Sequence, residues 1–322
     1  MAFPLDETAK WKELGGLDPE LEQVWKSSAP TDIATIAATR DPWKALYKAN
    51  ADKAVEEANG RVEKGEILIP RRDGGTSRAL VYKPSDPDTE PRPLLVLIHG
   101  GGFCFGSPEM EGGTCVSAVD RFGCVSQLVL PFGSREQVST ASEDCWDALV
   151  WITKYASKLG ADLSKGFVLG GTSAGGNIAI VLSHLARDEG MSPPLTGLYL
   201  NVPLVLAPEA VPQGHRVHEH EYRSYAADVG SPIWSPFNWP GSKPHSGLPR
   251  TYFQICGLDV LRDEGLMYER VLRKDYGIPT KVDLYPGLPH MFVPNFPEHS
   301  ATKKYPADTS RGIGWLFGVL TD

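Results

Sequence analysis

A strand pattern passes directly into a helix pattern through one tight turn, Gly171-Thr172-Ser173-Ala174-Gly175. Apolar residues 166–170 precede the turn, and residues 176–185 after it carry apolar side chains at helical spacing. The glycines let the helix and the strand approach closely, and a serine in such a turn adopts a strained conformation that exposes its hydroxyl. A plain glycine- and serine-rich turn is the alternative interpretation. The strand before the turn and the helix after it favour Ser173 as a nucleophile.

A second glycine-rich turn, His99-Gly100-Gly101-Gly102-Phe103, follows the apolar run 93–98. Glycines after a buried strand expose backbone N–H groups, which an acyl-transfer enzyme needs where a carbonyl oxygen becomes an oxyanion. We predict that the N–H groups of Gly101, Gly102 and Ala174 form this oxyanion hole. His99 precedes the serine in the chain, so a hydrogen-bonded support of the glycine turn is favoured over a catalytic base.

The candidate acid and base follow from chain order, because a serine in this strand-turn-helix context is followed by an acid and then by a histidine. Asp259 comes just after the strand-like run 251–256, and His290 follows the run 281–285. Open α/β sheets place their catalytic groups past the ends of strands. Asp263 and Glu264 are competing acids, but they fall where the next helix begins and suit its positive end.

Strand and helix patterns alternate over most of the chain, which predicts an α/β fold with a mostly parallel sheet and helices on both faces. Before this alternation, residues 1–60 are predicted to be helical, and two apolar runs flank a turn at Asp73-Gly74-Gly75 as in a hairpin. We predict one catalytic domain, residues 61–322, preceded by an N-terminal helical cap segment, residues 1–60. Its strands and helices are expected at Leu94–Ile98, Gly123–Leu130, Ser142–Lys158, Phe167–Leu169, Leu195–Asn201, Thr251–Cys256 and Arg262–Tyr276.

The interval between Val202 and Pro249 is too long for an ordinary loop. We predict a cap insertion at about residues 203–248, which joins the N-terminal helices in an apolar cap. Packing of the cap onto the core is the alternative role for most of its aromatic residues. These residues are Trp11, Trp25, Trp43, Trp234, Phe237 and Trp239.

Four apolar residues near the candidate triad are predicted to bind substrate. Phe103 follows the glycine turn, Trp234 lies in the cap insertion, and Met291 and Phe292 follow His290. Met291 and Phe292 suit an acyl pocket, with a position in the core as the alternative.

Composition narrows the function classes. The net charge of −8 and the pI near 5.5 argue against nucleic-acid binding. No apolar run is long enough for a transmembrane helix, and the first residues do not resemble a secretory signal. Five cysteines without a C-x-x-C pair suit a reducing cytoplasm. His215, His218 and His220 suggest a metal site, but solvated loop histidines are favoured, and no metal or cofactor is expected.

These motifs together resemble the hormone-sensitive lipase family of α/β-hydrolases, which includes bacterial, fungal and plant carboxylesterases. The resemblance runs from about Arg92 to the C-terminus and implies Ser173 as nucleophile, Asp259 as acid and His290 as base. A homodimer is a further expectation from the family. The motifs are H-G-G-G-F at 99–103, S-E-D-C-W-D-A-L at 142–149, G-T-S-A-G-G-N at 171–177, G-L-D-V-L-R-D-E-G at 257–265 and the late His290.

One segment departs from the family pattern. Members usually carry Tyr-Arg-Leu-Ala-Pro-Glu after the strand that follows the glycine turn, but the Tyr-Arg pair is absent from residues 127–136. The triad is unaffected, but the neighbouring loop and the floor of the pocket are expected to differ from those of other family members. We therefore expect a serine carboxylesterase acting on a small or medium-sized ester, such as an ester of a secondary metabolite. Cyclisation, lactonisation, elimination or acyl transfer is the alternative, and a ligand-binding receptor without activity is disfavoured by His290.

Overall fold

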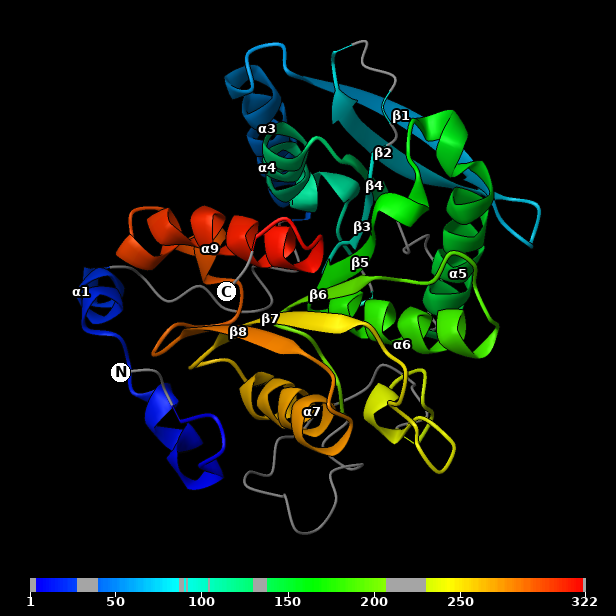
Figure 1. Cartoon of the computed structure of the whole chain (residues 1–322). Coiled ribbons are helices and arrows are strands. Elements are labelled where there is room, and N and C mark those ends of the chain that lie inside the picture. Colours follow the sequence, from blue (N-terminus) through cyan, green and yellow to red (C-terminus); the bar gives the residue numbers. More distant parts are fainter. Residues whose placement is uncertain are drawn as a thin grey trace.

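The computed structural model describes residues 4–27, 40–86, 90, 92–103, 105–129, 138–206 and 230–320. Within these residues, eight strands form one sheet in the order β1-β2-β4-β3-β5-β6-β7-β8 (Figure 1). Strands β3 to β8 are parallel, whereas β2 pairs antiparallel with both β1 and β4. The predicted α/β fold is confirmed. The strands are β1 Val62–Pro70, β2 Thr76–Pro84, β3 Leu94–Ile98, β4 Val125–Val129, β5 Phe167–Thr172, β6 Gly197–Asn201, β7 Arg250–Cys256 and β8 Thr280–Tyr285.

Helices cover both faces of this sheet, with α3, α4 and α9 on one face and α5, α6 and α7 on the other (Figure 1). Two short 3₁₀ segments matter for the site, η1 Thr8–Gly15 and η2 Pro108–Glu111. The helices are α1 Pro19–Ser27, α3 Arg40–Glu57, α4 Gly112–Phe122, α5 Val138–Tyr155, α6 Ala174–Asp188, α7 Arg262–Asp275, α8 Phe292–Asn295 and α9 Ser300–Leu316.

Strand β3 shows why both faces need a cover. Leu94, Val96 and Ile98 join the hydrophobic core that includes α5 and α6, whereas Leu95 and Leu97 join the core that includes α4 and α9. Successive side chains of a strand point to opposite faces, so an uninterrupted apolar run must be buried on both. The five-residue run that follows the hairpin is therefore the centre of the sheet.

The described part of the predicted cap insertion, residues 230–248, packs against the end of α6. The Trp239 indole N–H donates to the Asp188 carboxylate at 2.8 Å. The Arg187 guanidinium donates to the carbonyls of Pro244 and Ser246 at 2.6 and 2.9 Å. This segment is thus attached to the helix that begins directly after Ser173.

A buried histidine pair joins the same two elements. His184 of α6 donates from Nδ1 to the Ile180 carbonyl at 2.8 Å, so its Nε2 accepts the Nδ1–H of His245 at 3.0 Å. The His184 ring stacks on Trp239 with 4.5 Å between centroids. Burial lowers the pKa of His184 to about 3 and that of His245 to about 4, so both rings are neutral at pH 7.

Some expectations lie outside the described residues. They concern residues 130–136 of the departing segment, the cap residues 207–229 with the three loop histidines, Cys104, and the side chains of Trp25, Trp43 and residues 127–129.

Candidate active site

Ser173 connects β5 to α6 and adopts φ 57° and ψ −120°. This conformation costs a residue with a side chain about 1–3 kcal/mol, so its surroundings must hold it. Glycine is required on both sides of the serine. A Cβ on Gly171 would lie 2.3 Å from the carbonyl oxygen of Gly175, and a Cβ on Gly175 would lie 2.1 Å from that of Ile98. The turn therefore forms where the sequence predicts it.

Asn201, at the end of β6, fixes the entry to this turn. Its carbonyl accepts the Ser173 N–H at 2.8 Å, and its side-chain amide donates to Thr172 Oγ1 at 3.1 Å. The Thr172 hydroxyl in turn donates to the carboxyl of Glu111, and burial raises the pKa of that carboxyl to about 7. No sequence pattern pointed to this hydrogen-bonded network behind the serine.

The structure brings Ser173, His290 and Asp259 together. The Nε2 atom of His290 lies 3.1 Å from Ser173 Oγ, and its Nδ1 lies 2.7 Å from Asp259 Oδ2. Asp259 also accepts the Leu261 N–H at 2.9 Å, which fixes the orientation of the carboxylate. The arrangement orders nucleophile, base and acid in one hydrogen-bonded chain.

The competing acids are engaged elsewhere. Asp263 and Glu264 both lie in the first turn of α7. Asp263 forms an ion pair with Arg262 at 2.7 Å, and Glu264 accepts the Val205 N–H at 2.7 Å. In the part of the chain that the structure describes, neither side chain forms a hydrogen bond or an ion pair with His290, which leaves Asp259 as the candidate acid.

The predicted oxyanion donors lie on two turns that touch. Gly101 and Gly102 have φ of +124° and +57°, and a Cβ on Gly101 would lie 1.9 Å from the Phe105 carbonyl oxygen. Neighbouring Gly100 approaches the nucleophile so closely that a Cβ there would lie 3.4 Å from that of Ser173. Ala174 is the first residue of α6, so its N–H has no acceptor within the helix. Their catalytic role stays a prediction.

His99 supports the glycine turn from inside the protein. Its side chain is fully buried, and its Nδ1 lies 2.5 Å from the Gly100 carbonyl oxygen. Burial lowers the pKa of His99 to about 4, so the ring stays neutral. This is the supporting position that its place in the sequence favours.

The four predicted substrate-binding residues fall into two groups. Phe103 and Trp234 are both 6% exposed, with 5.2 Å between ring centroids, and Asn177 of α6 donates to the Trp234 carbonyl at 2.9 Å. Met291 has φ +53° and is partly buried, whereas Phe292 is 1% exposed and packs between the rings of Tyr285 and Tyr305. Binding by all four stays a prediction.

An N-terminal strap, residues 14–18, contacts the loops that carry the acid and the base. The Gly287 N–H donates to the Leu14 carbonyl at 2.8 Å, and the Asp18 N–H donates to the Gly287 carbonyl at 3.2 Å. A Cβ on Gly257 would lie 2.1 Å from the Leu14 carbonyl oxygen. The strap therefore lies against both loops, within a few residues of Asp259 and His290.

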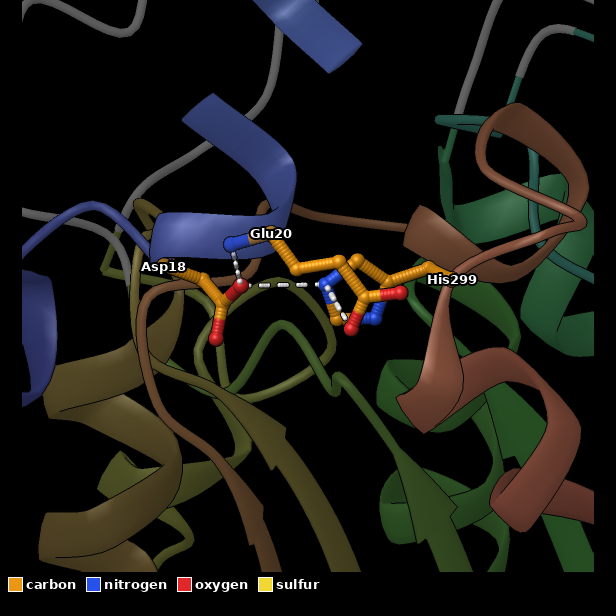
Figure 2. A group of neighbouring side chains, drawn as sticks. All are labelled: Asp18, Glu20 and His299. Carbon is orange, nitrogen blue, oxygen red and sulfur yellow. Dashed lines mark hydrogen bonds and ion pairs between the residues drawn. The ribbon is translucent and has the colours of Figure 1, made fainter. Parts of the chain in front are cut away.

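The strap continues into a cluster of Asp18, Glu20 and His299, which joins α1 to the start of α9 (Figure 2). Asp18 Oδ1 accepts the N–H groups of Glu20 and Leu21 at 2.8 and 3.1 Å and caps α1. The same oxygen lies 3.1 Å from His299 Nε2. Glu20 accepts the backbone N–H of Ser300 at 2.9 Å. We call this cluster the latch.

Three possible ligands within 4.8 Å of one another also suggest a metal site. The hydrogen bonds of His299 favour a different role. Its Nδ1 accepts the Ala301 N–H at 3.1 Å, so the ring proton is on Nε2, which donates to Asp18. A metal ligand needs a lone pair on Nε2 and a proton on Nδ1, which is the opposite tautomer. The cluster therefore fits a hydrogen-bonded latch better than a metal.

Comparison with known proteins places this geometry among related enzymes. The family described as alpha/beta hydrolase fold matches residues 95–294. An AB hydrolase superfamily protein of Schizosaccharomyces pombe is 32% identical over 93% of this chain and 94% of its own length. A versiconal hemiacetal acetate esterase of Dothistroma septosporum is 29% identical over 89% of this chain and 92% of its own.

Two solved structures superpose over nearly the whole chain. Vibralactone cyclase has a TM-score of 0.84 at 31% identity and covers 95% of this chain and 96% of its own. A bacterial heroin esterase has a TM-score of 0.77 at 27% identity, covering 94% of this chain and 98% of its own.

Proposed function

Since the chain belongs to the hormone-sensitive lipase-like family of α/β-hydrolases, we propose that it is a serine carboxylesterase acting on a small or medium-sized ester through an acyl-enzyme. The observation that carries this proposal is the hydrogen-bonded chain from Ser173 through His290 to Asp259. The esterases among its relatives support the reaction class.

The mechanism follows from that geometry. Ser173 attacks the ester carbonyl while His290 Nε2 takes its proton, and Asp259 holds the imidazole tautomer and stabilises the imidazolium. The N–H groups of Gly101, Gly102 and Ala174 bind the oxyanion, each contributing about 10²–10³ in rate. His290 returns the proton to the leaving alcohol as the carbon–oxygen bond breaks. Water, deprotonated by His290, then releases the acid and restores Ser173.

A second reaction class uses the same acyl-enzyme. If a hydroxyl of the bound acyl group reaches the ester carbonyl before water, the product is a lactone rather than a free acid. The likeness to vibralactone cyclase favours this alternative over elimination or transfer to another molecule. A binding role without catalysis is disfavoured, because His290 is present and oriented.

We propose further that the N-terminal segment 1–60 and the insertion at about 203–248 cap the site, and that the enzyme is a cytoplasmic homodimer. Four free, buried cysteines support the reducing location: Cys115, Cys124, Cys145 and Cys256. Among the described residues, no helix has the length and apolar character to cross a membrane.

The test combines labelling with turnover. A fluorophosphonate should label wild-type protein but not Ser173→Ala, and activated p-nitrophenyl esters should be hydrolysed more slowly than one preferred native ester. An acyl-Ser173 adduct, identified by mass spectrometry after incubation with a cell extract, would give the acyl group. Labelling of Ser173 without hydrolysis of any ester would favour the lactone-forming alternative. Absence of labelling would reject both the esterase and the lactone-forming proposals.

A further inference from the structure

A cavity of about 690 Å³ lies at the carboxyl ends of the strands, between α3, α4 and α9. Its wall contains Thr172, which immediately precedes Ser173, and Met291, which immediately follows His290. Much of the remaining wall is apolar, including Phe292 and Val293. The volume lies in the range of cavities that hold small organic ligands. The cavity therefore adjoins two residues of the candidate triad along the chain.

Two carboxyl groups interrupt this wall, and they differ in their partners. Glu109 forms an ion pair with Arg78 at 2.8 Å. No Lys or Arg in the described residues forms an ion pair with Glu111, which is 6% exposed and accepts a hydrogen bond from Thr172. A carboxyl oxygen has room for more than one donor. Glu111 thus has capacity to accept a hydrogen bond from a molecule in the cavity.

We propose, building on the esterase function above, that this cavity receives the acyl chain of the substrate and that Glu111 binds a hydroxyl carried on that chain. A plain hydrocarbon chain would shield the Glu111 carboxyl from solvent without offering it a hydrogen-bond donor, which is unfavourable. A hydroxyl supplies the missing donor without bringing a second charge into the interior. An ammonium would have to lose its own, much stronger hydration to reach the same position.

The hydroxyl should therefore act as a specificity element. Sites built to bind a substrate hydroxyl discriminate strongly against analogues that lack it, because a buried polar group is then left without its partner. Glu111 is also hydrogen-bonded to Thr172, which directly precedes Ser173 in the chain. A structural role there would affect all substrates alike, whereas a specificity role changes the ratio between substrates.

The main experiment compares p-nitrophenyl esters of straight-chain acids with and without a terminal hydroxyl, over a series of chain lengths. At the best length, wild-type kcat/KM should favour the hydroxylated ester by about tenfold or more. Glu111→Leu should bring this ratio to about one, and Glu111→Gln should keep most of it because the amide retains an acceptor. A wild-type ratio of one, or an unchanged ratio in Glu111→Leu, overturns the proposal. Glu63→Gln, which alters an exposed ion pair between Glu63 of β1 and Lys83 of β2, is the matched control and should leave the ratio unchanged.

A binding measurement separates this proposal from the esterase function. In Ser173→Ala, calorimetry should show tighter binding of a terminal alkanediol than of the alkanol of equal length. This comparison needs neither turnover nor a folded Glu111 variant. Equal binding, or tighter binding of an amino alcohol than of the diol, overturns the hydroxyl assignment even if ester hydrolysis is observed.

Discussion

The Asp259 carboxylate is 1% exposed, whereas the His290 imidazole bonded to it at 2.7 Å is 33% exposed. The acid is shielded from water, and the base remains accessible. A hydrogen bond to a shielded carboxylate is strong and directional, so Asp259 can hold one tautomer of His290 throughout the reaction.

Replacement of Asp259 by Asn is expected to lower kcat by about 10³–10⁴, because the amide favours the wrong tautomer of His290. Asp263→Asn is the matched control and should change kcat by less than about threefold, since Asp263 is 33% exposed and paired with Arg262. Steady-state kinetics on p-nitrophenyl acetate compare the two. A larger loss in Asp263→Asn would move the acid role to that residue.

Ser173→Ala and His290→Ala should each lower kcat by several orders of magnitude, and the double variant should lose little more than either alone. The reason is that the two side chains act as one unit, so removing either disables both. Equal melting temperatures would show that the fold is kept. Losses that multiply in the double variant would contradict a shared proton-transfer step.

Three buried histidines are each expected to lower stability on acidification below about pH 6.5, against the opposite contribution of Glu111, whose pKa burial raises to about 7. His99, His184 and His245 are neutral in the folded protein because burial lowers their pKa values to about 4, 3 and 4. In the unfolded chain these histidines take up protons near pH 6.5. Between pH 6.5 and its folded pKa, each histidine therefore lowers the free energy of unfolding by up to about 1.4 kcal/mol for each unit that the pH falls. Urea unfolding at pH 7 and pH 5 measures the loss. His245→Gln should reduce it, and an identical pH dependence in this variant would exclude His245 as a source.

The hydrogen bond between His299 and Asp18 can be removed while the cap of α9 is kept. His299→Asn keeps an acceptor for the Ala301 N–H but loses the bond to Asp18, whereas His299→Ala loses both. We expect kcat to fall several-fold in His299→Asn at temperatures where it is fully folded, with KM little changed, because the strap no longer steadies the Gly287 loop. Wild-type kcat in His299→Asn would show that the latch does not position the base.

The same cluster gives a direct test of its chemistry. Neither Zn²⁺ nor a chelator should shift the melting temperature of wild-type protein, because the His299 tautomer presents a proton to Asp18. A zinc-dependent rise in melting temperature that is lost in His299→Asn would instead establish a metal site.

Local patterns predicted the sheet, the serine turn and the chain order of acid and base. These features depend on neighbouring residues, such as the glycines that Ser173 requires. Three hydrogen bonds join residues far apart in the chain: Thr172 with Glu111, His245 with His184, and His299 with Asp18. The last two pairs are separated by 61 and 281 positions, and no periodicity encodes such contacts. Such contacts arise only when separate elements pack together. The N-terminal strap escaped sequence analysis for this reason.

The strap also bears on the order in which the active site forms during translation. Residues 14–18 leave the ribosome long before Gly257, Gly287 and His299, against which they rest. At about 5–20 residues per second, they wait many seconds for these partners. A nascent chain that has already formed the turn at Ser173 still lacks both the base and its support. Ester-cleaving chemistry is thereby withheld from the nascent chain until residues 257–299 have emerged and packed against the strap.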